Sequence, residues 1–232
     1  MPLFVGTSGY AYPAWKGRFY PAKLPAKQML GYYAERFPAV EMNNTFYKLP
    51  TAASLTATAA GVPAGFRFAV KAPQQITHIR RLKDADAAVA ELLESIPALG
   101  DRLGPLLFQL PPNLKKDADR LRTFLTLLPK TVRAAFEFRH PSWFDDEVFG
   151  LLRASGAALC LAEADDDLGV PAVATAGWGY LRLRRAEYDD QFLKAWAKRV
   201  REFGWSDTFV FFKHEDEANG PRFAARFREL VG

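Results

Sequence analysis

RAAFEFRHPSW, the stretch from Arg133 to Trp143, carries the strand signal from which we read the fold of this chain. Apolar and polar residues alternate along it, so an extended strand places its phenylalanines on one face and Glu137 and Arg139 on the other. Pro141 ends the run, because proline lacks the backbone donor that a central strand needs. A strand with a carboxylate and a guanidinium near its carboxyl end is predicted to contribute to a functional site as well as to the sheet.

Similar β-rich runs lie on both sides of this stretch, and most are followed by a helical pattern. We predict strands over residues 3–9, 39–47, 67–72, 105–110, 133–140, 158–163, 180–184 and 208–214. Helical patterns cover residues 27–37, 52–60, 84–99, 118–128, 145–154, 191–203 and 221–230, whereas the segment after the sixth strand is a poor helix. Eight such units predict a parallel sheet with crossover helices. A TIM-like (β/α)8 barrel, a closed parallel sheet with outer helices, is the expected fold, and a doubly wound open sheet is the alternative.

Length and composition limit the class of protein. The chain has 232 residues, 49% of them hydrophobic, which is enough for one core, so we expect a single domain over residues 1–232. The formal charge of +5 permits attraction to phosphates without identifying a nucleic-acid-binding protein. The lone Cys160 excludes an internal disulfide and a zinc cluster of cysteines. Neither a signal-peptide pattern nor a membrane-length apolar run occurs, so a cytoplasmic protein is expected. The sequence does not predict the oligomeric state.

The alternation also predicts which side chains point into the barrel. In six strands the apolar residues fall on one face, expected to meet the helices, and mostly polar residues fall on the other. The first and sixth strands are ambiguous. Functional sites of such barrels lie at the carboxyl ends of the strands, so the polar residues there should converge on one mouth. They are Glu41, Asn43, Lys71, Gln109, Glu137, Arg139, Arg182, Arg184 and Lys213. The alternative is that these charges only neutralise one another inside a plugged barrel.

Several motifs, taken together and in order, resemble one known family. They are GTSGY at residues 6–10, WKGRFYP at 15–21, EMNNTFY at 41–47, FAVKAP at 68–73 with ITH at 76–78, GPLLFQLPP at 104–112 and FEFRHPSW at 136–143. This set resembles the domain-of-unknown-function-72, or YecE-like, proteins, and the resemblance implies a (β/α)8 barrel without an assigned activity. Two departures replace neutral polar positions by basic ones: RLRR at 182–185 and FFKHED at 211–216.

The first functional hypothesis is an enzyme, a metal-independent hydrolase, lyase or isomerase, that acts on a small anionic (phosphorylated) or sugar-like molecule. Two carboxylates that face one cavity can differ in pKa and divide acid and base roles, which makes Glu41 and Glu137 candidate catalytic residues. Lys71 or Arg139 would polarise a carbonyl or hold an oxyanion. A Schiff base at Lys71 is a further option, and an ion pair with one of the two glutamates is its alternative. We expect neither a metal nor an organic cofactor in this enzyme.

Substrate contacts are predicted around the same mouth. The loops after the seventh and eighth strands often bind phosphate in such barrels, and here they offer Arg182, Arg184 and Lys213. An acidic run at 215–217 opposes these cations. His78 follows the third strand, either as a proton donor and substrate contact or as a loop-fixing hydrogen-bond partner. The predicted substrate-binding residues are Asn43, Tyr47, His78, Gln109, Trp143, Arg182, Arg184 and Lys213.

Two other classes of function stay open from the sequence. The first is a metal-dependent hydrolase or isomerase, or a nuclease-like barrel, with ligands from Glu41, Glu137, Glu163, Asp165, His140 and His214. The second is a non-catalytic module that binds nucleic acid or a small ligand. Its aromatic loop residues would be Tyr10, Tyr12, Trp15, Tyr20, Phe46, Tyr47 and Trp143. A small anionic molecule is the partner that the cationic positions favour most.

Overall fold

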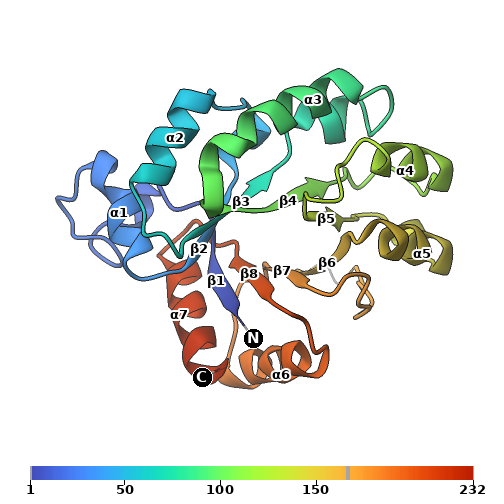
Figure 1. The fold of residues 1–232 in the computed structure, drawn as a ribbon. Coiled ribbons are helices and arrows are strands. Elements are labelled where there is room, and N and C mark those ends of the chain that lie inside the picture. The colour runs from blue at the N-terminus through green and yellow to red at the C-terminus, as the bar shows by residue number, and fades with distance from the viewer. Residues whose placement is uncertain (1, 166–167, 232) are drawn as a thin grey trace.

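Eight parallel strands, in sequence order around the ring, close into one barrel in the computed structural model, which describes residues 2–165 and 168–231 (Figure 1). The strands are β1 (Leu3–Ser8), β2 (Ala39–Met42), β3 (Arg67–Lys71), β4 (Leu103–Gln109), β5 (Ala134–Glu137), β6 (Ala158–Glu163), β7 (Gly179–Leu183) and β8 (Thr208–Phe212). β1 pairs with both β2 and β8, which closes the ring. The predicted (β/α)8 barrel is therefore confirmed.

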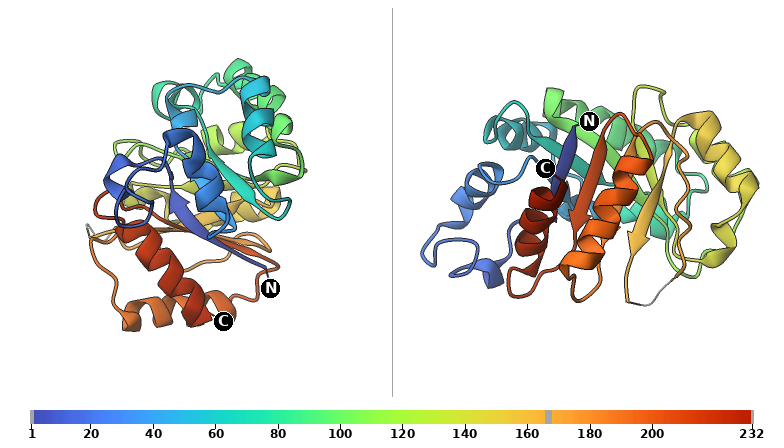
Figure 2. Two further views of the ribbon diagram at one scale, coloured as in Figure 1. Left: turned by 90° about the vertical axis from the view of Figure 1, so that its left-hand side faces the viewer. Right: turned by 90° about the horizontal axis from the view of Figure 1, so that it is seen from below.

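Helices surround the barrel on its outer side (Figure 1). They are α1 (Met29–Ala34), α2 (Ala52–Ala60), α3 (Asp86–Ser95), α4 (Ala118–Leu125), α5 (Asp146–Ser155), α6 (Asp190–Glu202) and α7 (Asn219–Val231). Asp145 and Asp189 begin α5 and α6, because each carboxylate accepts a hydrogen bond from a backbone N–H of the first turn. Figure 2 shows that α7 runs beside β1 and β8 and that the two ends of the chain lie close together.

The segment between β6 and β7 replaces a helix by a loop, as the sequence predicts. Its described residues form no helix, and residues 166–167 lie outside the described part of the chain. The hydroxyl of Thr175 ties this loop to the start of β6. It accepts from the N–H of Leu159 at 2.7 Å and donates to the carbonyl of Ala157 at 2.8 Å.

Seven of the strands end earlier than predicted, and the difference is largest for β2 and β5. β2 ends at Met42, because the next residues turn into a short 3-10 helix over Asn44–Phe46. β5 ends at Glu137 rather than at residue 140, so Arg139 lies in the loop after the strand. Asn43 and Arg139 are therefore presented by loops that leave the barrel, whereas Glu41 and Glu137 remain on the strands.

The alternation of the strands separates two apolar layers. Outward side chains such as Phe108 and Phe136 pack against Phe124 of α4. Inward side chains fill part of the barrel with large and small apolar residues. The large ones are Tyr180, Phe209, Phe211 and Leu107, and the small ones are Ala39, Ala69, Ala135 and Ala158. In the ambiguous sixth strand, Cys160 belongs to this inner layer. Polar side chains continue the inner face toward the carboxyl ends of the strands.

None of the helices in the described part of the chain is long and apolar enough to cross a membrane.

Candidate functional site

Arg182 of β7 lies inside the barrel and binds two glutamates from other strands. Its Nε and Nη2 atoms donate to the carboxylate of Glu41 at 2.9 and 2.8 Å, and its Nη1 donates to Glu137 at 2.6 Å. Tyr180 adds a hydrogen bond to Glu41 at 2.7 Å, and Gln109 adds one to Glu137 at 2.9 Å. All five side chains are buried, so this cluster links β2, β4, β5 and β7 through charge-assisted hydrogen bonds away from water.

The electrostatics of this cluster fix the charge state of Glu137. Burial alone would raise its pKa, but Arg182, then Arg184, the Gln109 amide and Arg139 lower the pKa to about 2. A carboxylate that is held ionised in this way is a poor proton donor or acceptor near neutral pH. Glu137 of the predicted acid/base pair is thus held ionised beside Arg182, and Glu41 binds the same guanidinium.

Two further guanidinium groups approach Glu137 only loosely. Arg139 Nε lies 3.7 Å and Arg184 Nη2 lies 3.8 Å from Glu137 Oε1, and neither contact is a hydrogen bond. Both arginines line a cavity of about 320 Å³ under the loop 168–172, together with Glu163, Trp196 and Arg199. Three guanidinium groups and one carboxylate thus surround this cavity, which favours an anionic occupant.

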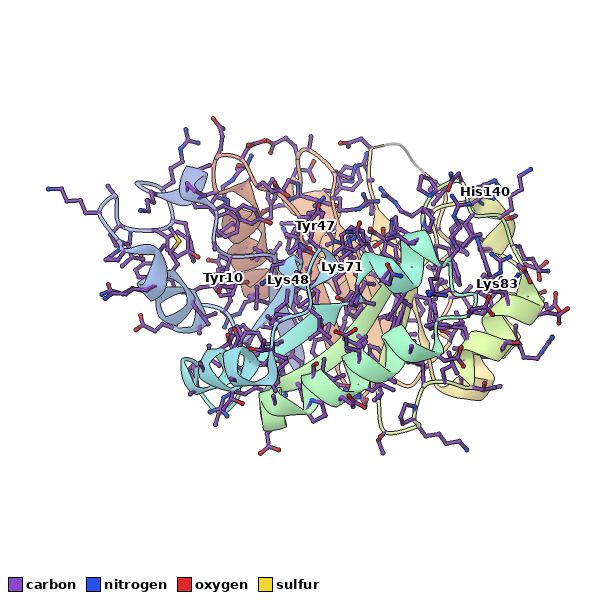
Figure 3. All side chains as sticks on the ribbon, turned by 90° about the horizontal axis from the view of Figure 1, so that it is seen from above. Tyr10, Tyr47, Lys48, Lys71, Lys83 and His140 are labelled. Carbon is purple, nitrogen blue, oxygen red and sulfur yellow. The ribbon has the colours of Figure 1, made fainter. Side chains whose placement is uncertain are left out.

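Lys71 ends β3 and lies half-buried near the middle of the molecule, in the same region as Tyr47 and Lys48, whereas His140 lies farther off (Figure 3). Its Nζ is 4.1 Å from the centre of the Phe46 ring. The buried hydroxyl of Thr45 donates to the Lys71 carbonyl at 2.7 Å, which holds the turn that carries Phe46 against the strand end. Burial, and then Arg182, lower the pKa of Lys71 to about 8, against the opposing effect of Glu41 and Glu137.

His78 completes this side of the mouth from the single π-helical turn Gln75–Ile79 after β3. Its ring packs edge-on against Phe46, with the centroids 4.9 Å apart, and its Nδ1 is hydrogen-bonded to the Thr77 hydroxyl at 2.9 Å. Burial and the charges of Lys71 and Arg139 lower the pKa of His78, so its imidazole is neutral at neutral pH.

Several buried polar atoms around the mouth have no hydrogen-bond partner in the protein. They are Ser8 Oγ, Asn43 Oδ1, Glu137 Oε1 and Arg184 Nε. Buried polar groups are usually paired, and an unpaired one calls for an explanation such as a ligand. These four atoms belong to the ends of β1, β2, β5 and β7, which is where a barrel ligand would lie.

The remaining predicted substrate contacts differ in placement. Tyr47 is 76% exposed, which leaves its ring available, and Lys213 is exposed after β8. Lys213 shares a second cavity with Arg184 and with the acidic residues 215–217, so carboxylates lie beside the cations that were predicted to bind phosphate. Arg182 does not line this cavity, because its guanidinium lies inside the barrel and binds Glu41 and Glu137.

Trp143 was predicted to contact the substrate, and its burial contradicts this prediction. Its side chain is completely buried, stacks on Phe138 with centroids 4.7 Å apart, and donates from Nε1 to the Leu114 carbonyl at 2.7 Å. An indole without solvent exposure cannot touch a substrate in this conformation. The residue instead anchors the loop after β5, which also carries Arg139.

The residues of the other two hypotheses are largely occupied elsewhere. Trp15 and Tyr20 are buried core residues, so the predicted aromatic binding surface is reduced. Glu163 accepts from Trp196 Nε1 at 2.9 Å, and His140 Nδ1 is bonded to Ser142 at 2.8 Å. Within residues 2–165 and 168–231, no three His, Cys, Asp or Glu side chains are grouped so that they could hold a metal ion.

Four residues of the site were missed by sequence reasoning. Tyr180 lies two residues before Arg182 on the same face of β7, so strand alternation alone would have found it. Ser8 lies on the ambiguous first strand. Trp196 and Arg199 come from α6, and no local signal shows which side of a helix borders a cavity.

The fold and the mouth define this chain as a (β/α)8-barrel protein with a polar site at the carboxyl ends of its strands. It belongs to the family described as protein of unknown function DUF72, whose family model matches residues 4–232.

Relatives and solved structures agree with this assignment. The chain is 30% identical to the UPF0759 protein YecE of Escherichia coli over 143 residues, which are 61% of this chain and 50% of that protein, so it spans about half the length of the YecE protein that it matches. It is 24% identical to the UPF0759 protein YunF of Bacillus subtilis, covering 99% of this chain and 94% of that one. The crystal structure of a DUF72 family protein from Thermotoga maritima superposes with a TM-score of 0.89 at 27% identity, over 100% of this chain and 99% of the other.

Proposed function

We propose that this protein is an enzyme that binds a small anionic molecule at the mouth of the barrel and acts on it by proton transfer at Lys71. The observation that carries the proposal is the loose approach of Arg139 and Arg184 to Glu137, at 3.7 and 3.8 Å. Arg182 donates a hydrogen bond to Glu137 at 2.6 Å, whereas these two guanidinium groups make none to it, so they keep donors for another anion.

The anionic group of the substrate is assigned to the cavity under the loop 168–172. Arg184 is 16% exposed and Arg139 is 30% exposed, so both are partly desolvated yet reachable. Partly buried guanidinium groups bind phosphate or carboxylate in a bidentate manner and more strongly than exposed ones. A phosphoryl or carboxyl group provides the anion that these guanidinium groups bind, whereas a neutral sugar has no negative charge to offer them.

The reacting part of the substrate is assigned to the Lys71 side of the mouth. An amine with a pKa of about 8 is neutral in roughly one molecule in ten at pH 7, and it can therefore accept a proton. Glu41 and Glu137 both bind Arg182, and we assign them the role of holding this cation in place of an acid/base role.

Anion binding is the experiment that tests the proposal. Sulfate and inorganic phosphate should raise the melting temperature of the protein, and titration calorimetry should detect one site. Arg139→Met and Arg184→Met should each weaken this binding about tenfold or more, as expected for the loss of a charge-assisted pair. Arg226→Met is the matched control, because Arg226 pairs with Asp190 on the helical surface.

The proposal is wrong if sulfate stabilises the Arg139→Met and Arg184→Met variants as much as the native protein. Sodium chloride at equal ionic strength separates specific binding from general screening of the +5 charge.

A further inference from the structure

Lys71 differs from the three arginines of the mouth in its partners. Within the described residues its Nζ forms no ion pair with a carboxylate, whereas Arg139, Arg182 and Arg184 all lie within 4 Å of Glu137. Its Nζ lies over the ring of Phe46, 4.1 Å from the ring centre. An aromatic face stabilises a cation more weakly than a carboxylate at contact distance does.

Arg182 is the reason for this arrangement. The two carboxylates that point into the same end of the barrel are Glu41 and Glu137, and Arg182 binds both at 2.6–2.9 Å. Its planar guanidinium reaches two acceptors at once, which a lysine ammonium cannot match in geometry. Lys71 is thereby left beside an arginine and without its own counter-ion.

The consequence is an amine that is partly unprotonated at neutral pH. The charged groups that act on Lys71 are Arg182, Lys213, Glu41 and Glu137, and burial adds to the effect of the two cations. Its pKa of about 8 leaves roughly a tenth of the amine neutral at pH 7, compared with less than about one part in a thousand for an ordinary lysine. Lysines that are desolvated and placed beside another cation are the ones that act as nucleophiles.

A proton carrier lies on the same aromatic ring. The His78 imidazole packs edge-on against Phe46, whose ring also contacts the Lys71 ammonium. His78 is only half-buried, so it can exchange protons with solvent. Carbinolamine breakdown needs such a group, because the oxygen must leave as water.

We propose that Lys71 is a Schiff-base residue whose amine forms an imine with a small aldehyde or ketone that carries a phosphate or carboxylate group. The neutral Nζ attacks the carbonyl carbon, the C=O π bond breaks, and one proton of the nitrogen moves to the oxygen. The nitrogen lone pair then forms the C=N bond, and the oxygen takes a proton relayed from solvent through His78 and leaves as water. The product is the protonated imine, whose nitrogen keeps its remaining proton. The anionic group rests on the function proposed above, since Arg139 and Arg184 would hold it.

Reductive trapping tests this inference. Pyridoxal 5′-phosphate is used as an aldehyde probe that carries a phosphate, and pyridoxal is the matched probe without it. After reduction with borohydride, peptide mass spectrometry should locate the adduct at Lys71, formed at least tenfold faster than at the exposed Lys48. The rate should rise through pH 8, and the phosphate-bearing probe should react faster than pyridoxal.

Two variants and one ligand make the outcome decisive. Lys71→Arg should abolish the fast adduct and Lys48→Arg should not change it, while sulfate should slow labelling of the native protein. If the native protein binds sulfate but Lys71 is labelled no faster than Lys48, the Schiff-base inference fails and the anion site stands. If Lys71 is labelled rapidly but equally by both probes, the lysine chemistry stands and the anion site fails.

Discussion

Arg182 is the residue on which the inner polar cluster depends. Replacing it by Met would leave the fully buried Glu41 without a counter-ion, and would leave the fully buried Glu137 with only its looser contacts to Arg139 and Arg184. Removal of one partner from a buried ion pair typically costs about 3–5 kcal/mol, and here two carboxylates lose the same partner. We expect Arg182→Met to lower the free energy of urea unfolding at pH 7 by at least that amount.

A triple variant separates this explanation from a simple loss of packing. Combining Arg182→Met with Glu41→Gln and Glu137→Gln removes the stranded charges, so the triple variant should be more stable than Arg182→Met alone. If the triple variant is equally unstable or worse, the cost lies in packing and not in unpaired charge. Arg226→Met, on the surface, should have little effect in the same assay.

For individual residues, the sequence predicted the face on which a side chain lies better than it predicted the residues that the side chain binds. Strand alternation correctly placed Glu41, Glu137 and Arg182 on the inner face, because a side chain's face follows from its register alone. It did not show that Arg182 would bind both glutamates and leave Lys71 unpaired. That outcome depends on distances across the barrel, between residues about 45 to 141 positions apart in the chain.

Among the elements, the β1–β2 pair depends on a close approach at Gly6. A Cβ atom there would lie 1.9 Å from the Ala39 carbonyl oxygen and 2.7 Å from the Tyr33 hydroxyl. That hydroxyl donates to Ala39 and accepts from the N–H of Thr7, so it fixes α1 to the first two strands. We expect Gly6→Ala to destabilise the fold by about 3 kcal/mol or more, through displaced backbone.

Gly31 provides the matched control for this substitution. It lies within α1, and a Cβ atom there would meet nothing within 4 Å. Gly31→Ala should therefore be neutral or stabilising by up to about 1 kcal/mol, because alanine favours a helix over glycine. Urea unfolding followed by circular dichroism compares the two, and equal stability of both variants would contradict the close-approach argument.

Element boundaries show why some of the site could be predicted and some could not. The helix over residues 52–60 was predicted to the residue, since Thr51 caps it with a local hydrogen bond to the N–H of Ser54. The carboxyl end of β5 was predicted three residues too late, because this end depends on where β6 stops pairing. The cavity walls from α6 and the loop 168–172 have no local signal, as they are set by how distant segments pack.

For the whole molecule, the inner cluster makes stability depend on pH in a defined direction. Glu137 has a folded-state pKa of about 2, against an ordinary value of 4.5. A carboxyl with a depressed pKa stabilises the fold fully above its unfolded value and loses that contribution as pH falls from 4.5 toward 2. Because Glu137 is linked through Arg182 to β2 and β7, the loss should weaken the closed barrel as a unit.

We expect the free energy of unfolding of the native protein to fall steeply between pH 4.5 and 3. Glu137→Gln should be less stable at pH 7, because Arg182 loses half of its counter-charge. Between pH 4.5 and 3 its free energy of unfolding should depend less on pH than that of the native protein, and the difference in slope should correspond to at most one bound proton. Asp190→Asn is the control: the Arg226 guanidinium also lowers the pKa of Asp190, but that pair is exposed and screened by water, so its slope should change less. Urea titrations at half-unit pH intervals measure all three slopes, and an unchanged acid slope in Glu137→Gln would show that this carboxylate is not the group whose protonation weakens the barrel.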